Sequence, residues 1–185
     1  MKLACFSRTP QKKGENNRLR RENAIPAILY GKGEIQPIFV KQDEFSAMIR
    51  SMNPDLLATT PVELQDGQKT HKVLVKEVQY HRSSYAVEHI DFFLIPEKAL
   101  IQVNVPIQIT GAADSTGVKL GGFVRQVIRS ITVECLLRDL PKEFTLDVRE
   151  LVIGQCKRLS DIPMPAGVKP IAKLEEVAVV IAKKV

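Results

Sequence analysis

The sequence predicts a mainly β protein with short helices (an α+β chain), divided into two domains near residue 95. Most of its apolar residues lie in short runs rich in Val, Ile and Leu, and glycine turns separate these runs. Helical periodicity is confined to a few short segments. The pattern of apolar runs and turns changes after Pro96, which is a plausible domain boundary. A chain of 185 residues is long enough for one large or two small domains.

The first half begins with a predicted strand over residues 3–7. A basic loop follows this strand. A short helix ending near residue 21 is expected next, capped by Asn16 or Asn17. Either side-chain oxygen can accept a backbone N–H that the first turn of a helix leaves unpaired. Residues 25–30 form the next predicted strand.

Residues 43–52 are predicted to form an amphipathic helix, because apolar side chains recur there at the spacing i, i+3, i+4 and i+7. The clearest hairpin in the chain follows, in the stretch 61–81. Asp66-Gly67 is expected to supply the positive φ angles that a tight turn between two strands requires.

The second arm of this hairpin contains a break in its alternation. Val73 and Val75 share a face, but the next apolar residue is Val78, one position later than strict alternation allows. One extra residue at this point predicts a β-bulge, which redirects side chains. Lys76 and Gln79 are the polar residues that such a bulge would direct outward.

Residues 85–95 form another predicted strand, on which His89 and Asp91 alternate and therefore point the same way. A histidine beside a carboxylate is either an acid/base pair or a hydrogen-bonded surface pair. No nucleophile is near them in the sequence, which favours the surface pair.

The second half is predicted to be mostly β. The expected strands cover residues 99–111, 123–137 and 175–185, and residues 161–170 form a proline-rich loop. The one helical candidate in this half is a short segment over residues 147–151.

Several classes of function lack their motifs. The three cysteines are far apart with no CxxC pair, and with the three histidines they give no structural-zinc spacing. The stretch GVKLGG is not followed by the Lys-Ser or Lys-Thr of a phosphate-binding loop. We therefore predict neither an enzyme nor a metal or cofactor site. Reduced cysteines, together with the absence of any signal-like or membrane-spanning apolar run, predict a soluble cytoplasmic protein.

Positive charge is concentrated near the N-terminus. The chain carries a formal net charge of +6, and between Arg8 and Arg21 six cations stand against one carboxylate, Glu15. Such a run is often only a solvated helix face. Arginine predominates in the stretch RLRR, however, and its planar guanidinium binds phosphate through two parallel hydrogen bonds. RNA is favoured over DNA, since the chain has no helix-turn-helix or zinc finger to enter a major groove.

Several ordered motifs resemble one known family. NRLRRENAIPAILYGKG, VLVKEVQYH and HIDFFLI in the first half are similar to bacterial ribosomal protein L25. VECLLRDLPKEFTLDVRELVIGQ, followed by AGVKP and EEVAVV, resembles the second domain of its longer form, the CTC (general stress protein) subfamily. The resemblance covers nearly the whole chain.

The resemblance implies a β-barrel over residues 1–95, which binds 5S ribosomal RNA in the large (50S) ribosomal subunit, and a C-terminal β-domain over residues 96–185. It also implies which residues contact the RNA. They are Arg8, Lys13, Asn16, Arg18 and Arg20 in the basic segment, and Tyr30, Lys76, Gln79, His89 and Asp91 on the barrel; charge alone adds Lys12 and Arg21.

Two accounts of the function stay open on the sequence. The first is a structural constituent of the large subunit, whose C-terminal domain contacts either rRNA or neighbouring ribosomal proteins. The second is a stress-induced factor that visits ribosomes or other RNA while its C-terminal domain binds a protein partner. Sedimentation with the 50S particle in ordinary growth would favour the first account, and neither involves a membrane.

Overall fold

The computed structural model describes residues 2–8, 14–31, 33–67, 69–96 and 99–183. It confirms a mainly β chain with short helices. Contacts between Cα atoms divide the chain into two compact units, Met1–Ala99 and Leu100–Val185. The sequence placed the boundary after residue 95. Each unit has its own hydrophobic core, so each is described by itself.

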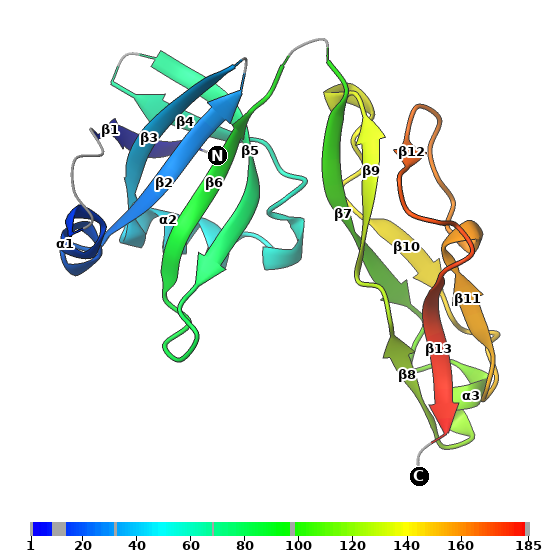
Figure 1. Ribbon diagram of the computed structural model, residues 1–185. Helices are drawn as coiled ribbons and strands as arrows, with labels where there is room; N and C mark the ends of the chain where they lie inside the picture. The colour runs from blue at the N-terminus through cyan, green and yellow to red at the C-terminus, as the bar shows by residue number, and fades with distance from the viewer. Residues whose placement is uncertain (1, 9–13, 32, 68, 97–98, 184–185) are drawn as a thin grey trace. The chain divides into compact units, whose positions relative to one another are not determined.

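The first unit is a closed β-barrel (Figure 1). Its strands join in the order β1-β3-β2-β6-β5-β4, and the ring closes where β1 pairs with β4. The β1–β4 and β2–β6 pairs are parallel and the other four are antiparallel. Closure leaves the barrel without a free sheet edge. The strands are β1 (Lys2–Ser7), β2 (Ala24–Gly31), β3 (Glu34–Lys41), β4 (Val62–Asp66), β5 (Lys69–Tyr80) and β6 (Val87–Leu94).

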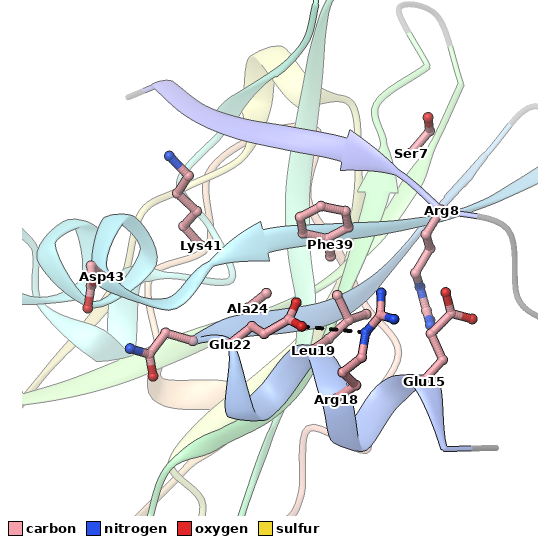
Figure 2. A pocket seen from close by; sticks show the side chains of 11 residues that line it. Ser7, Arg8, Glu15, Arg18, Leu19, Glu22, Ala24, Phe39, Lys41 and Asp43 are labelled. Carbon is pink, nitrogen blue, oxygen red and sulfur yellow. Dashed lines mark ion pairs between the residues drawn. The ribbon is translucent and has the colours of Figure 1, made fainter. Parts of the chain in front are cut away.

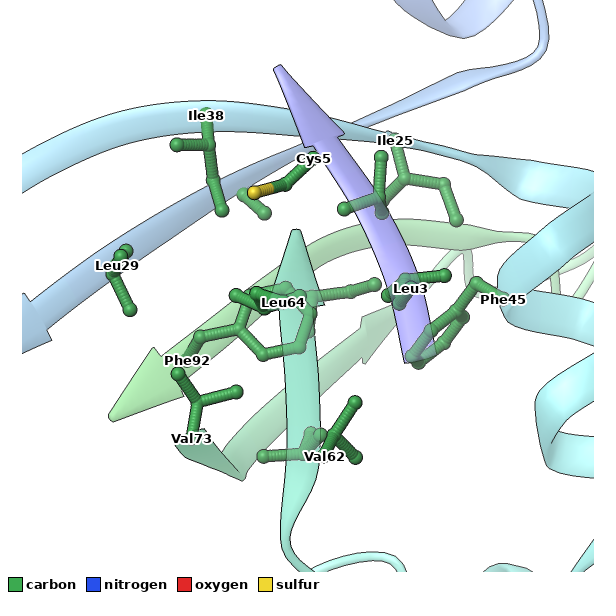
Figure 3. Packing of buried hydrophobic residues seen from close by; sticks show 14 of the residues in the cluster. Leu3, Cys5, Ile25, Leu29, Ile38, Phe45, Val62, Leu64, Val73 and Phe92 are labelled. Atoms are coloured by element: carbon green, nitrogen blue, oxygen red, sulfur yellow. The ribbon is translucent and has the colours of Figure 1, made fainter. Parts of the chain in front are cut away.

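The barrel interior is aliphatic, with two phenylalanines (Figure 3). Alternate residues of each strand point inward, as Ile90 and Phe92 do on β6, and both are fully buried. Helix α2 (Gln42–Ser51) adds Phe45 and Met48 to this core, with Ile49 packed beside them. The amphipathic helix predicted over residues 43–52 is therefore confirmed.

Helix α1 (Glu15–Arg21) confirms the short basic helix, but not its predicted cap. Gly14 is the N-cap, and it has no side chain to accept a hydrogen bond. The two asparagines expected to cap the helix lie inside it, where their oxygens accept from arginine side chains instead. Asn23 follows the helix with φ +56°, a left-handed conformation that asparagine tolerates better than most residues.

The hairpin of β4 and β5 is confirmed, and its turn differs by one residue from the prediction. Asp66 is the last residue of β4 and pairs with Lys69, so the positive φ angle of +58° belongs to Gly67 and not to Asp66. Strand β3 was not predicted. It pairs with both β1 and β2.

The predicted β-bulge is confirmed at Lys76. Val75 pairs with Phe92 on β6 and Glu77 pairs with Asp91, so Lys76 is the extra residue of the bulge. A second irregularity follows, because Gln79 pairs with His89 and Tyr80 pairs with Val87. Here Glu88 is the extra residue, on the opposite strand.

The second unit consists of two small sheets around a shared core. One has the strand order β10-β7-β9-β12 and the other the order β11-β13-β8 (Figure 1). Strands β7 (Ile101–Thr110), β9 (Ser130–Cys135), β10 (Phe144–Asp147) and β12 (Lys169–Pro170) form the first sheet; β8 (Gly122–Gln126), β11 (Cys156–Arg158) and β13 (Val177–Lys183) form the second. The short helices are α3 (Thr116–Lys119) and the 3₁₀ turns Leu137–Asp139 and Leu159–Asp161, with a further 3₁₀ turn, Pro54–Leu56, in the first unit.

Two predictions for the second unit are wrong in detail. The helix expected over residues 147–151 is a turn after β10, in which the Leu151 N–H donates to the Val148 carbonyl at 3.2 Å. This bond lets the chain fold back so that Val148 and Leu151 are both buried. The single strand expected over residues 123–137 is divided between β8 and β9, which belong to different sheets.

Candidate nucleic-acid interface

The outer surface of strands β2, β6 and β5 gathers the side chains that the sequence singled out on the barrel. The register places Tyr30 beside Phe93, Glu77 beside Asp91, and Gln79 beside His89. Alternate residues such as Ile90 and Phe92 point into the core, so these side chains point outward. We call this set the barrel face: Tyr30, Lys76, Glu77, Gln79, His89, Asp91 and Phe93.

One end of the barrel face is aromatic and cationic. The Tyr30 and Phe93 rings lie 5.6 Å apart between centroids, and Lys76 Nζ lies 5.3 Å from the centroid of Phe93. Burial lowers the pKa of Lys76. Burial, followed by the charges of Asp91 and Glu77, raises the pKa of Tyr30, so its phenol is neutral. A neutral phenol both donates and accepts hydrogen bonds, and the rings offer a surface on which a base can stack.

The other end of the barrel face is polar, with His89 and Asp91 partly buried and Glu77 and Gln79 exposed. His89 Nδ1 lies 2.8 Å from Asp91 Oδ1, with the two side chains 17% and 29% exposed. A carboxylate on Nδ1 fixes the ring and its proton, which leaves Nε2 to meet a ligand. Beside this pair Gln79 Nε2 donates to Glu77 Oε1 at 3.5 Å. The pair predicted from alternation is therefore a structured hydrogen-bonding site.

Helix α1 is joined to the barrel by Arg20. Its Nε and Nη2 atoms donate to the Glu88 carbonyl at 3.3 and 3.1 Å, and Nη1 donates to Asn17 Oδ1 at 3.3 Å. Glu88 is the extra residue of the second bulge, a position that leaves its backbone outside the regular ladder. Arg20 therefore fixes α1 one residue away from His89.

The other arginines of α1 face solvent. Arg18 Nε lies 3.5 Å from Glu22 Oε1, but the two side chains are 71% and 58% exposed. An exposed i,i+4 pair contributes only about 0.3–0.5 kcal/mol, so Arg18 can exchange Glu22 for a stronger anion. Arg21 is also exposed, and in the described part of the chain its side chain forms no ion pair.

Arg8 lies in a hollow of about 630 Å³ between α1 and strands β1 and β3 (Figure 2). Arg8 Nη1 donates to Asn16 Oδ1 at 2.5 Å, and Arg8 Nε is buried with no hydrogen-bond partner among the described residues. The charged side chains lining the hollow are three cations, one of which is Arg18 of α1, and three carboxylates, so their formal charges cancel. Lys12 and Lys13 lie outside the described residues.

Three parts of this surface were missed by the sequence reasoning. Phe93 alternates with Asp91 and His89 on one strand, and that alternation was sufficient to find it. Glu77 follows from the same reasoning applied to β5. The Glu88 carbonyl had no signal in the sequence, because it depends on the register between β5 and β6.

Comparison with known proteins gives matches over both units. Residues 3–92 match the model of the Ribosomal L25p family, and residues 100–184 match the model described as ribosomal protein TL5, C-terminal domain. Proteins named large ribosomal subunit protein bL25 are similar over the full length of both chains: 40% identical in Chlamydia abortus, 38% in Chlamydia trachomatis serovar L2 and 36% in Chlamydia pneumoniae. The chain belongs to the bL25 family of ribosomal proteins.

Membership in the bL25 family confirms a structural, non-enzymatic role in the large ribosomal subunit, and with it a place in the cytoplasm. None of the helices within the described ranges is long and apolar enough to cross a membrane. Among the residues whose positions are described, no three His, Cys, Asp or Glu side chains lie together in a group that could hold a metal ion. The general stress designation stays a prediction.

Proposed function

We propose that this bL25 protein binds 5S ribosomal RNA through one continuous surface, formed by helix α1 and the barrel face. The observation that carries the proposal is the Arg20–Glu88 contact. It joins a helix with exposed arginines to a strand with a fixed histidine, across 68 positions of the sequence. Charge and hydrogen-bonding groups are thereby brought to one side of a rigid barrel.

Helix α1 supplies the attraction to phosphate. Arg18 and Arg21 are exposed, and guanidinium groups bind phosphate oxygens in a bidentate geometry. Each phosphate they neutralise releases counterions, which makes the affinity fall with salt. This term gives affinity and orientation, with little preference for sequence.

The barrel face provides the preference for base edges and 2′-hydroxyls over the phosphate backbone. Glu77 and Asp91 lie side by side there, and two carboxylates repel a phosphate backbone. They accept hydrogen bonds from 2′-hydroxyls and from base amino groups instead, beside His89 and Gln79. A double-stranded RNA presents such groups in its wide, shallow minor groove. The barrel face therefore suits base edges and sugars, while α1 follows the flanking backbone.

The test is the affinity of the full-length protein for 5S rRNA, measured over a series of salt concentrations. Arg18→Gln removes one phosphate contact, so the slope of log K against log salt should fall by about 0.7–0.9. His89→Ala removes a hydrogen-bonding side chain of the barrel face. It should weaken binding by about tenfold and leave the slope unchanged.

A transfer RNA at equal phosphate concentration serves as the competitor, and Arg50→Gln serves as the matched control. Arg50 is an exposed arginine on α2, so its loss removes the same charge from a different part of the barrel. Equal binding of both RNAs, or equal effects of Arg18→Gln and Arg50→Gln, would show a general affinity for polyanions in place of a 5S site.

A further inference from the structure

The second unit carries a cationic sheet face that the proposed 5S surface does not use. Strands β8, β13 and β11 lie side by side, with Phe123 opposite Ala182, and with Arg125, Val180 and Cys156 in one row across the three strands. Val179 and Ile181 on β13 point into the core, so this row points outward. We call this outward set the small-sheet face: Phe123, Arg125, Val180, Ala182, Cys156 and Arg158.

The three strands of the small sheet carry charge of one sign, and the carboxylate of Asp161 lies beside the end of β11, where it accepts from the Arg158 N–H. Residues 122–129, 156–158 and 177–183 contain five cations and no carboxylate. The side chains of Arg125, Arg129 and Arg158 are exposed and form no ion pair within the described ranges. Unpaired like charges on one small sheet repel one another, so a bound anion would relieve this repulsion.

The other sheet of the same unit provides an internal comparison. Its outward positions are mainly uncharged and polar, such as Gln102, Asn104 and Thr132, and Glu134 there stands opposite Lys169. Of the two sheets of the second unit, the small sheet therefore carries the more positive outward face.

The exposed ring of Phe123 favours a nucleic acid over an acidic peptide as the anion that binds to this face. It is 47% exposed and lies two residues from Arg125 on the same face of β8. An exposed aromatic ring beside guanidinium groups is how sheet surfaces hold single-stranded nucleic acid, with bases stacked on the ring and phosphates on the cations. An acidic peptide would use the charges but gain little from the ring.

We propose that the small-sheet face is a second RNA-binding surface, which takes an unpaired segment of RNA with a base on Phe123 and phosphates on Arg125 and Arg158. None of its residues belongs to the barrel face or to α1. The proposal goes beyond 5S binding, and either can fail while the other holds.

The rate at which Cys156 is alkylated can be used to measure binding to this face in the full-length protein. The Cys156 side chain is exposed on β11, two residues before Arg158 and across Val180 from Arg125, whereas Cys5 and Cys135 are buried, 2% and 0% exposed. Alkylation by iodoacetamide should therefore label Cys156 first. A single-stranded oligouridylate, added as the probe, should slow this labelling, and its concentration dependence gives the affinity of this site alone.

Substitutions distinguish the contribution of the two arginines from that of Phe123. Arg125→Gln with Arg158→Gln should abolish the protection, or lower the salt slope of the remaining protection by about 1.4. Phe123→Ala should raise the half-protecting oligouridylate concentration by about tenfold. The matched double variant with lysine keeps both charges and should keep most of the protection, which shows that the protection depends on charge at these two positions. Arg18→Gln should leave the protection unchanged.

The outcomes that would overturn the proposal are distinct. Unchanged Cys156 labelling with oligouridylate, or protection in the double glutamine variant that keeps the wild-type salt slope, would show that RNA does not bind to this face. Stronger protection by polyglutamate than by oligouridylate at equal charge would assign the face to an acidic protein instead.

Discussion

Arg18 and Arg20 lie two residues apart on α1, and the structure assigns them different tasks. Arg20 makes three hydrogen bonds within the protein, two of them to the Glu88 carbonyl, while Arg18 is 71% exposed. Replacing each with glutamine in turn removes the same charge from the same helix. We therefore expect the two variants to differ in kind: Arg20→Gln should lower stability, and Arg18→Gln should lower the salt slope of 5S binding.

The magnitudes follow from the contacts. Hydrogen bonds to a charged group contribute about 1.5–3 kcal/mol where they are well shielded, and Arg20 is partly exposed, so its loss should cost about 1–2 kcal/mol in the free energy of unfolding. The exposed pair of Arg18 with Glu22 contributes about 0.3–0.5 kcal/mol. In RNA binding, Arg20→Gln should reduce affinity because α1 is no longer fixed beside His89. The salt slope should change by much less than the roughly 0.7–0.9 expected for a lost phosphate contact.

Urea unfolding of the two variants measures the stability, and titration of 5S rRNA at several salt concentrations measures the slope. Arg20→Lys is a useful third variant, since it keeps the charge but cannot make the paired contact to a carbonyl. If Arg20→Gln lowers the slope as much as Arg18→Gln and leaves stability unchanged, Arg20 contacts RNA directly and its role in fixing α1 is refuted.

Two further predictions concern the barrel core. Phe45 is fully buried, so Phe45→Ala should cost about 3–5 kcal/mol and lower the urea midpoint of the barrel while the transition of the second unit stays in place. Burial, followed by the charge of Asp66, raises the pKa of the Cys5 thiol from 9.0 to about 11. The unfolded chain therefore ionises first as the pH rises, so the stability that neutral Cys5 contributes is complete below pH 9 and is lost toward pH 11. The stability difference between wild type and Cys5→Ala, measured by urea unfolding, should shrink over that interval.

Local signals in the sequence were sufficient for some elements and misleading for others. The helix over residues 43–52 and the β4–β5 hairpin were predicted because their patterns are complete within a few residues. The expected helix at 147–151 fails because Val148 and Leu151 are buried by a turn, and helical spacing alone cannot distinguish the two. The strand expected over 123–137 is continuous in sequence, but it crosses from one sheet to another.

The candidate site also combines features that the sequence predicts with features that it does not predict. The outward direction of His89 and Asp91 follows from alternation along one strand, so the sequence contained it. Their neighbours Glu77 and Gln79 lie on another strand, and only the register shows which residues stand opposite each other. The contact of Arg20 with the Glu88 carbonyl joins segments far apart in the chain through a backbone atom. No residue-type pattern signals such a contact.

The two bulges limit the polar end of the barrel face to a short stretch of β5 and β6. Before Lys76, Val75 pairs with Phe92, and after Glu88, Tyr80 pairs with Val87; both pairs belong to one regular register. Only the three pairs between the bulges are shifted by one residue, and the pairs Glu77–Asp91 and Gln79–His89 are two of them. Without the first bulge, strict alternation after Val75 would turn Glu77 toward the core and Val78 toward solvent. The shifted window therefore keeps Val78 against the barrel core, directs the hydrogen-bonding groups outward, and frees the carbonyl that fixes α1, all within one short stretch of two strands.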